Sequence, residues 1–310
     1  MTRTETIAVG EAILAITLWG ISFIFIKIAL REISAVNLIV LRYAMGALCV
    51  GLFAWRRGDF QQLTWADAPK LALVGAIGIT LQQFLQVTGQ ITADASVAAF
   101  LAATAPAFTV ILAAVWLHER LRFWQVIGVG LASLGGIIVA TGGDFAALFI
   151  GQALPALSGN FLILLSSMVW AMFIILSKRL VRKRPTALVT SGIFFFGMLF
   201  TLPFFLASQT WSEIPRLSLG GWGAMLYVGL LSTAVAYLLN SHALKHISAA
   251  RVAAIQNMEP LSAMAAAFVM LNESPSWAMA LGGAAILSGV YLAERNAPEV
   301  VEMQVTGSKE

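Results

Sequence analysis

Two halves of this chain match each other at fixed offsets, and no other feature restricts the possible fold as strongly. At an offset of 151 residues Trp19 falls on Trp170, and after a three-residue insertion, at an offset of 154, Pro106 falls on Pro260. Each half contains five apolar runs of about 20 residues, the length that crosses a bilayer. Because five crossings bring the chain out on the opposite side, the second half is predicted to lie inverted relative to the first.

The composition places these runs in lipid rather than in a soluble core. Hydrophobic residues make up 59% of the 310 residues, charged residues make up 11%, and the mean hydropathy is +0.86. A spanning β-barrel would need short alternating segments, whereas a run such as residues 261–271 is unbroken. We therefore predict an all-α integral membrane protein with helices at residues 8–30, 37–55, 70–89, 94–117, 122–141, 159–178, 186–207, 219–241, 247–271 and 276–294.

The repeat divides the chain into three parts. Residues 1–145 form the first predicted five-helix repeat, and residues 146–296 form the second, inverted repeat. Residues 297–310 contain Pro, Glu, Ser and Lys with little hydrophobicity, which predicts a disordered tail. Inverted repeats of this kind build alternating-access transporters, whose ligand sites lie near the midplane between the repeats.

Basic residues fall mainly on one side of this topology. With a cytoplasmic N-terminus, fifteen of the nineteen Lys and Arg residues lie in cytoplasmic segments, and only Lys27, Arg31, Arg42 and Arg216 lie toward the outer side. The positive-inside rule then places both termini in the cytoplasm. The formal charge of +4 is therefore interpreted as an orientation signal, and no nucleic-acid partner is predicted.

The sequence carries no signature of an enzyme. Its single cysteine, Cys49, can form no intramolecular disulfide, and His118, His242 and His246 lie at predicted loop ends without other metal ligands. A glycine-rich phosphate-binding loop is also missing from the sequence. We predict no catalytic residue, no metal and no cofactor.

Two matched prolines interrupt the hydrogen bonding of the fourth and ninth predicted helices. Pro106 and Pro260 fall near the middle of these helices and free the carbonyl groups of Ala102 and Gln256. Freed backbone groups in a membrane must be buried in protein or face a wet cavity, so both kinks are predicted to face the bundle interior. Packing of kinked helices without a ligand explains these prolines equally well.

Polar side chains occupy equivalent places on the third and eighth predicted helices. Residues spaced i, i+3 share one face of a helix. Amide side chains that faced lipid would lack hydrogen-bond partners, so we favour the interpretation that these polar side chains line a cavity. Hydrogen bonding between helices is the alternative. The third helix carries Gln82, Gln83, Gln86 and Gln90, and the eighth carries Tyr237 and Asn240 at the places equivalent to Gln83 and Gln86.

The ninth predicted helix carries Gln256, Asn257 and Glu259 about midway through its span. An ionised carboxylate at that depth costs about 2.5–3.5 kcal/mol, so Glu259 needs a partner, water or a proton. It is the best single candidate for a functional residue. Arg42, about one and a half turns into the second helix, is a possible ion-pair partner, in which case both residues could be purely structural.

Two matched tryptophans lie far from the interfacial position that tryptophan normally takes. Trp19 and Trp170 fall near the middle of the first and sixth predicted helices. Two symmetry-related indoles at this depth are typical of walls for a planar or apolar ligand. Core packing, with the indole N–H bonded to a neighbouring amide, is the alternative.

Structural roles are expected for the matched small and acidic residues. Small residues such as Gly135 and Gly289 let helices approach closely in lipid. Glu119 and Glu273 each end one predicted helix and open the next, where a carboxylate would cap the positive end of the following helix.

Six short motifs follow one another along the chain, four in the first half and two in the second. They are Leu18-Trp19-Gly20-Ile21-Ser22-Phe23, Leu41-Arg42-Tyr43, Ala105-Pro106, Leu117-His118-Glu119-Arg120-Leu121, Glu259-Pro260-Leu261 and Leu271-Asn272-Glu273. With them, the membrane portion resembles the drug/metabolite transporter superfamily, specifically its ten-helix branch with two EamA domains. Within it, the chain is similar to YddG-type bacterial exporters of aromatic amino acids.

The resemblance implies a basket of ten helices around a central cavity, in the bacterial inner membrane. Small four-helix members of the superfamily carry a coupling glutamate in the first helix, but residues 12–16 hold none here. Glu11 is too near the cytoplasmic end to replace it. Facilitated efflux and coupling through Glu259 both stay open.

We predict an inner-membrane exporter of small amphipathic metabolites, with aromatic or apolar amino acids as its substrates and a monomer as its expected form. A sugar-nucleotide, nucleoside or drug carrier is the alternative. A nucleotide would call for basic residues inside the cavity, whereas Lys27 and Arg42 are expected nearer the outer face. An intramembrane enzyme would need a second acid at the depth of Glu259.

Overall fold

The computed structural model describes residues 3–116, 123–144, 154–181, 184–247 and 255–295, and most of these residues are helical, with no strand among them. Eight of the helical stretches are long and apolar enough to span a membrane, and two shorter apolar helices, Glu259–Leu271 and Trp277–Leu292, accompany them. The predicted all-α membrane class is confirmed. The predicted tail, residues 297–310, and Glu119 lie outside the described residues.

The elements follow the order of the predicted spans, with three spans divided into shorter pieces. In the first half they are α1 (Arg3–Ala29), α2 (Ala35–Arg56), η1 (Asp59–Gln62), η2 (Trp65–Asp67), α3 (Ala68–Gly75), η3 (Ala76–Leu81), α4 (Gln82–Thr92), α5 (Ala95–Ala102), α6 (Ala105–Trp116) and α7 (Phe123–Thr141). In the second half they are α9 (Leu154–Val181), α10 (Thr186–Ser208), η4 (Thr210–Arg216), α11 (Leu219–Leu226), η5 (Tyr227–Val235), α12 (Ala236–His246), α14 (Glu259–Leu271) and α15 (Trp277–Arg295).

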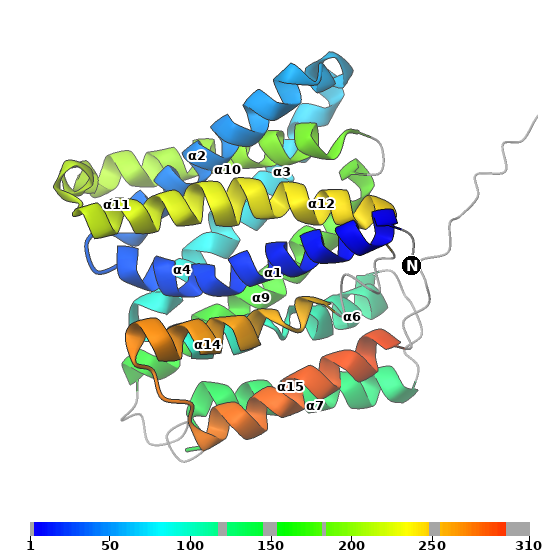
Figure 1. Ribbon diagram of the computed structural model, residues 1–310, viewed down its shortest axis with the longest axis vertical. Helices are drawn as coiled ribbons and strands as arrows, with labels where there is room; N and C mark the ends of the chain where they lie inside the picture. The colour runs from blue at the N-terminus through cyan, green and yellow to red at the C-terminus, as the bar shows by residue number, and fades with distance from the viewer. Residues whose placement is uncertain (1–2, 117–122, 145–153, 182–183, 248–254, 296–310) are drawn as a thin grey trace, which may run out of the picture.

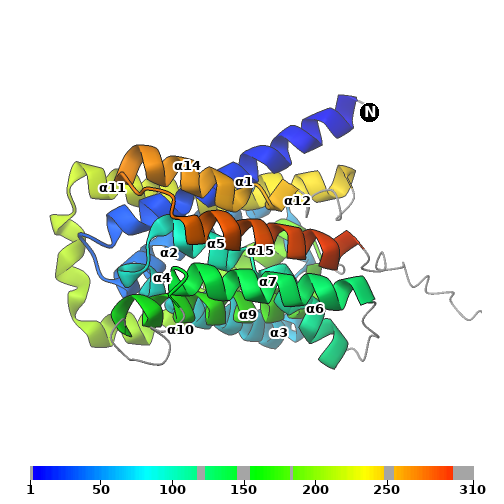
Figure 2. The same ribbon diagram turned by 90° about the horizontal axis from the view of Figure 1, so that it is seen from below.

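The long helices lie side by side in one bundle. Figure 1 shows them from α2 and α10 at the top to α7 and α15 at the bottom, and Figure 2 shows the same bundle from below. The buried apolar residues form two main clusters, one around α2 and α10 and the other around α5, α7 and α15. Apolar side chains also cover the outside of the bundle, as lipid requires.

Equivalent helices of the two halves run in opposite directions. The end of α1 and the start of α9 both lie beside the end of α4, since Lys27 donates to the carbonyl of Gln90 at 3.0 Å and Gly159 packs against Gly89. Likewise, Asn37 near the start of α2 donates to the carbonyl of Thr210, just after the end of α10, at 2.8 Å. Each half is therefore inverted relative to the other.

The helices α7 and α15 approach each other closely at two equivalent places. A Cβ atom added to Gly135 would lie 2.5 Å from the carbonyl oxygen of Gly282, and one added to Gly289 would lie 2.5 Å from that of Gly128. Only glycine permits so close an approach of two backbones. The two halves are thus joined at this seam by glycines that match each other in the repeat.

The helices that contain the matched prolines are interrupted rather than bent. α5 ends at Ala102 and α6 begins at Ala105, while a turn at 257–258 precedes α14, which begins at Glu259. The carbonyl of Leu101, rather than that of Ala102, accepts a hydrogen bond from Ser167 of α9 at 3.1 Å. Both breaks fall at equivalent positions of the repeat.

A second matched irregularity is a π-helical segment in the third helix of each half. η3 precedes α4, and η5 precedes α12 at the equivalent place. The wider turn displaces carbonyl groups, and in η5 the hydroxyl of Thr233 donates to the carbonyl of Val228 at 2.7 Å. Such π segments are frequent at functional sites, and the sequence analysis did not predict them.

Candidate functional site

A buried arginine connects the two halves inside the bundle. Arg42 of α2 is 5% exposed. Its Nε donates to Thr233 Oγ1 at 2.8 Å, its Nη1 to Gln83 Oε1 at 3.1 Å, and its Nη2 to Ser232 Oγ at 3.5 Å. Gln83 belongs to the first half, and both hydroxyls belong to the π segment η5 of the second. The guanidinium therefore holds α2, α4 and η5 together.

Three of the predicted glutamines continue this cluster. Gln83 Nε2 donates to Gln82 Oε1 at 2.6 Å, and Gln82 Nε2 donates to Gln86 Oε1 at 2.7 Å. Gln82 and Gln83 are buried, whereas Gln86, at the end of the series, is half-buried. The amides are thus oriented by Arg42 and by one another. In this conformation only Gln86 lies at the edge of the cluster.

The cluster lies inside the helical stretches that carry it rather than at their ends. Counted along their helices at 1.5 Å per residue, Arg42 is about 10 Å from the start of α2, and Gln83 is about 14 Å from the end of α4. Glu259 is about 18 Å from the end of α14. All three residues therefore lie about two turns or more from these helix ends.

Aromatic rings adjoin the cluster. The ring of Tyr237 meets that of Trp19 edge to face at 5.1 Å and that of Phe194 at 5.2 Å. The indole N–H of Trp19 donates to the carbonyl of Ser232 at 2.8 Å, which fixes the ring against η5. Trp19 and Tyr237 are both half-buried. They form a wall next to the residues that bind Arg42.

Trp170 is not part of this wall. Its ring stacks on Phe173 at 4.7 Å, and Phe173 in turn covers Gly78 in the π segment η3. The matched tryptophans therefore have different partners, because the position of Phe173 is held by Ser22 in the first half.

Glu259 opens α14 without a charged partner among the described residues. Its carboxylate is half-buried, and no hydrogen bond or ion pair joins it to a described side chain. The ion pair with Arg42 that the sequence suggested is not formed. Gly20 of α1 packs against the backbone of Glu259 and leaves no room there for a side chain.

The other predicted polar residues make fewer contacts. Asn240 Oδ1 is buried without a hydrogen-bond partner in the described part of the chain. Gln256 and Asn257 lie at the break before α14 and are half-buried. The nitrogen and the oxygen of the Gln90 side-chain amide are also without a hydrogen-bond partner among the described atoms. The structure therefore joins Gln82, Gln83 and Gln86 directly, but not Gln90, Asn240, Gln256 or Asn257.

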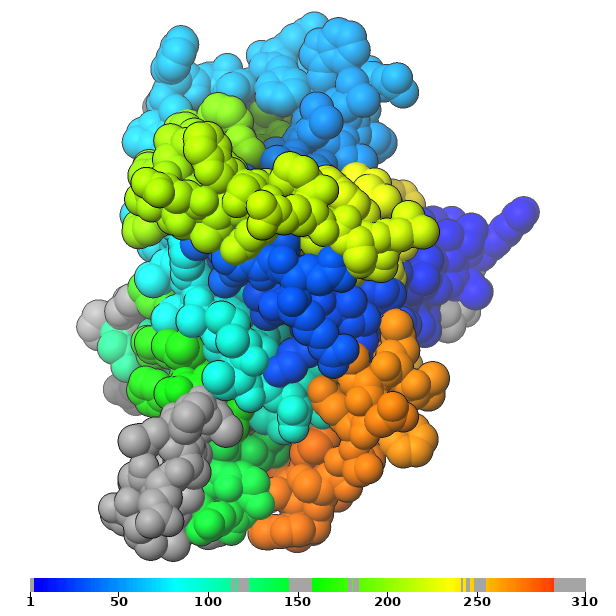
Figure 3. All heavy atoms as spheres, turned by 90° about the vertical axis from the view of Figure 1, so that its left-hand side faces the viewer, coloured from blue at the N-terminus to red at the C-terminus, as the bar shows by residue number. Residues whose placement is uncertain are grey.

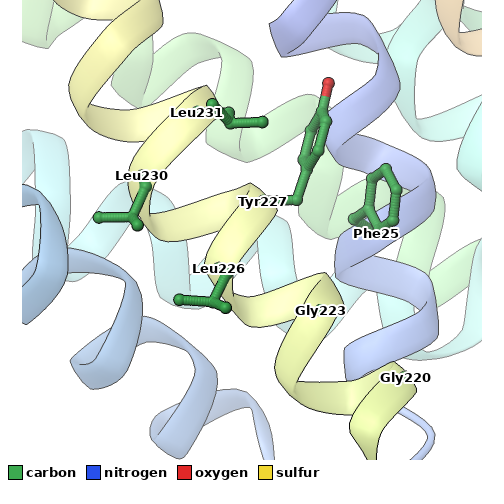
Figure 4. Close-up of a pocket in the computed structure, with 7 residues that line it drawn as sticks. All are labelled: Phe25, Gly220, Gly223, Leu226, Tyr227, Leu230 and Leu231. Atoms are coloured by element: carbon green, nitrogen blue, oxygen red, sulfur yellow. The ribbon is translucent and has the colours of Figure 1, made fainter.

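Two pockets lie away from the cluster. The first, of about 420 Å³, is an apolar groove between α1 and the chain from α11 into η5, lined by residues such as Phe25 and Tyr227 (Figure 4). The second, of about 90 Å³, includes Arg57 and His242. Neither contains a residue that hydrogen-bonds to Arg42. The first groove is shallow and open to the outside of the bundle.

Carboxylates tie the halves together at the end of the bundle opposite the N-terminus, which we call the distal end. Each accepts hydrogen bonds at the start of a helix from the other half, where the helix dipole favours negative charge. Figure 3 faces this end and shows α1, α4 and α14 packed together. The pairs are Glu32 with Ser218 before α11, Glu213 with Ser34 before α2, and Glu273 with Ala95 and Ser96 in α5.

These caps differ from the expected ones and affect neighbouring acids. Glu273 caps α5 of the other half, and the expectation that it caps the following helix is wrong. The hydroxyl of Ser218, followed by its backbone N–H, lowers the pKa of Glu32 below its usual value. Burial, followed by the nearby charge of Glu273, raises the pKa of Asp94. The distal end is thus a closed, charged seam between the halves.

The opposite end has fewer described contacts between the halves. Glu11 of α1 pairs with His242 of α12 at 2.6 Å, and Asp67 pairs with Arg184 at 2.9 Å. No group of three or more potential metal ligands occurs among the described residues. Glu11 is therefore engaged at this end of the bundle, far along α1 from the Arg42 cluster.

Comparison with known proteins agrees with this architecture. Residues 6–141 and 157–294 each match the model of the EamA-like transporter family. A probable terminal-alkyne amino-acid exporter from Streptantibioticus cattleyicolor is 27% identical over 93% of this chain and 93% of its own length. A probable amino-acid metabolite efflux pump from Salmonella typhimurium is 25% identical over 91% of this chain and 92% of its own. A solved crystal structure with 20% identity shares the fold, with a TM-score of 0.65 over 92% of this chain and 96% of that one.

Proposed function

Because the chain belongs to the EamA-like transporter family, we propose that this multi-pass membrane transporter exports aromatic and apolar amino acids. The observation that carries the proposal is the cluster around Arg42, to which both halves contribute. Arg42 and Gln83 come from the first half, and Thr233 and Tyr237 come from the second. A site shared in this way is remodelled whenever one half moves against the other.

The names of the relatives support the substrate class. One relative is named as an exporter of a terminal-alkyne amino acid, and another as a pump for amino-acid metabolites. An amino acid also suits the composition of the cluster, which combines charged and amide groups with aromatic rings. The positive-inside pattern supports a bacterial inner-membrane location with both termini in the cytoplasm.

In the proposed cycle, the two halves rock about the buried site. The described conformation has its distal end tied by the three carboxylate caps, so release on that side requires these caps to part. Trp19 and Tyr237 pack on the side chain of the substrate. The helix breaks before Pro106 and Pro260 lie at equivalent places of the repeat, and broken helices of transporters contact their ligands near the midplane.

The remaining predicted residues have proposed places in this cycle. Gln86, Asn240, Gln256 and Asn257 are free to hydrogen-bond the polar groups of the substrate when the site opens, while Gln82 and Gln83 orient the cluster. Trp170 contacts the substrate only if the π segment η3 shifts away from Phe173. Glu259 meets the substrate ammonium group or a proton.

Transport by the purified protein in liposomes tests the function. Vesicles loaded with unlabelled L-phenylalanine should take up labelled L-phenylalanine at a saturable rate that other aromatic and apolar amino acids reduce. Empty liposomes and vesicles loaded with L-aspartate are the controls. Flux no higher than in empty liposomes, across a panel of amino acids, would show that the proposed function is wrong.

The same vesicles test Glu259. Glu259→Gln keeps the size of the side chain but removes its charge, so uptake and its response to an imposed pH gradient should both decrease. Glu11→Gln, which breaks a pair at the end of the bundle, should keep the wild-type response. An unchanged response in Glu259→Gln would mean that the carboxylate is structural.

A nucleoside or sugar-nucleotide carrier is the second candidate. The observation that favours it is Arg42, which supplies a basic group to the cluster, where the sequence analysis expected none. A nucleotide with several negative charges would need more than one such group, and Arg42 is the one cation hydrogen-bonded within the described cluster. Competition of labelled L-phenylalanine uptake by nucleoside monophosphates separates the two candidates.

A further inference from the structure

We propose that Arg42 is the anchor for the carboxylate of the substrate, which makes the site selective for ligands with an anionic group. This inference rests on the proposed function, because it names the group of the amino acid that the cluster recognises. The sequence analysis predicted a cavity lining of glutamines and asparagines and considered Arg42 only as a possible ion-pair partner of Glu259.

The charge of Arg42 is not neutralised by the described protein. All three of its side-chain hydrogen bonds go to neutral oxygens, and no carboxylate among the described residues forms an ion pair with it. The ring of Tyr43, 5.4 Å from the guanidinium carbon, compensates part of the charge. A buried charge in lipid is costly and is normally paired. An anion that enters the site would complete this pairing.

The guanidinium also has donors left for a ligand. Arginine has five N–H groups, and the described bonds use one on each of its three nitrogen atoms. One N–H therefore remains on Nη1 and one on Nη2. Two donors on neighbouring nitrogens match the two oxygens of a carboxylate.

The neighbours of Arg42 hold its guanidinium group in one orientation. Thr233 Oγ1 donates its own hydrogen to Val228, so it can only accept from Arg42. Gln83 uses its amide nitrogen on Gln82, so its oxygen faces the guanidinium. Two acceptors with fixed direction orient the charged group before any ligand arrives, which lowers the entropic cost of binding.

The surroundings suit a whole amino acid. The ring of Tyr237 meets that of Trp19, whose indole N–H donates to the carbonyl of Ser232, and the hydroxyl of Ser232 accepts from Arg42. Gly20, next to Trp19, packs against the backbone of Glu259. A zwitterion between Arg42 and Glu259 would place a negative group by the guanidinium and an ammonium group by the carboxylate. Its aromatic side chain would then lie along the wall.

Binding of four compounds to the purified protein tests the assignment by titration. The reference compound is L-phenylalanine. Two of the others, L-phenylalaninamide and phenethylamine, lack its carboxylate, and the fourth, 3-phenylpropionate, lacks only its ammonium group. The wild type should bind L-phenylalanine about 10- to 100-fold more tightly than its amide, because charged hydrogen bonds are lost with the carboxylate. In Arg42→Gln the affinity for L-phenylalanine should fall by a similar factor while that for the amide hardly changes.

Two further variants keep the test decisive. Thr233→Val keeps the volume of the side chain but removes an acceptor of the guanidinium, so it should reduce the acid-to-amide ratio by a smaller factor. Arg57→Gln removes a cation that is 56% exposed at the end of α2 and should leave the ratio at its wild-type value. An acid-to-amide ratio near one in the wild type, or an undiminished ratio in Arg42→Gln, overturns the proposal.

The outcomes also separate this inference from the proposed function. If amino acids are transported but the acid-to-amide ratio is independent of Arg42, the proposed role of Arg42 is wrong and the proposed export function is supported. If 3-phenylpropionate binds only when Arg42 is present and no amino acid is transported, the anchor stands and the exporter is wrong. If none of the four compounds binds to the wild type, both are wrong.

Discussion

Glu32 shows how single residues connect the halves at the distal end. Its carboxylate accepts hydrogen bonds from the hydroxyl and the backbone N–H of Ser218, each at 2.7 Å. These bonds lower the pKa of Glu32 from its ordinary value of 4.5. A carboxylate whose pKa is lower in the folded state stabilises that state above the ordinary pKa, and the effect is lost as the pH falls through the lowered pKa.

This linkage predicts a pH-dependent difference in stability. Glu32→Gln should melt at a lower temperature than the wild type at pH 7, and the two melting curves should converge below about pH 4. Ser218→Ala provides the comparison, because Ser218 Oγ also accepts from Gly221 N at the start of α11. Part of its destabilisation should therefore persist at low pH. A difference between wild type and Glu32→Gln that is the same at pH 7 and pH 3 would contradict the assignment.

At the residue scale, the sequence analysis selected some members of the cluster but not the residue at its centre. Gln82, Gln83, Gln86, Trp19 and Tyr237 were selected because polar or aromatic groups at mid-span are unusual. Arg42 was considered only as a possible partner of Glu259, although a long side chain carries its charge well away from its own backbone. The signal that could have found it is its position seven residues inside an otherwise apolar helix.

Thr233 and Ser232 were missed for a different reason. Hydroxyl side chains are common in membrane helices because they can bond their own backbone, so they carry little information by themselves. Their role here depends on the π segment η5, which turns both toward Arg42. No pattern in the sequence predicts that segment.

At the element scale, the repeat predicted which helices correspond, but not how they are divided. The ten spans were predicted from length and hydropathy, and the prolines marked the helices that the structure interrupts. The π segments have no proline and no change of hydropathy period. They are stabilised by tertiary contacts, such as the one between Trp19 and the carbonyl of Ser232, and these contacts are invisible until the fold is known.

The seam between α7 and α15 gives a prediction at this scale. Gly135→Val should destabilise the protein by roughly 1–3 kcal/mol, because the new side chain would meet the backbone of Gly282 and Ile286. Gly130→Val on the same helix is the matched control, since a Cβ atom there meets nothing within 4 Å. Thermal unfolding in detergent compares them. Equal losses in both variants would contradict the described packing.

At the scale of the whole molecule, inversion follows from an odd number of crossings in each half, and contacts between equivalent helices agree with it. What the sequence could not supply is the conformation that the chain adopts. The described state has a tied distal end and a cluster whose side chains bond to one another. An alternating-access carrier must leave this state in every cycle, so the ties at the distal end are the place to interrupt it.

Locking the distal end and measuring transport tests the central claim most directly. In a Cys49→Ala background, Ser96→Cys and Glu273→Cys place thiols where α5 and the end of α14 now share a hydrogen bond of 2.6 Å. After joining by a short, cleavable bis-methanethiosulfonate reagent, L-phenylalanine exchange in proteoliposomes should fall to the level of empty liposomes and return on reduction. Each single-cysteine variant, treated identically, should keep its exchange. If the fully cross-linked protein exchanges L-phenylalanine as fast as it does after the cross-link has been reduced, alternating access between the two halves is contradicted.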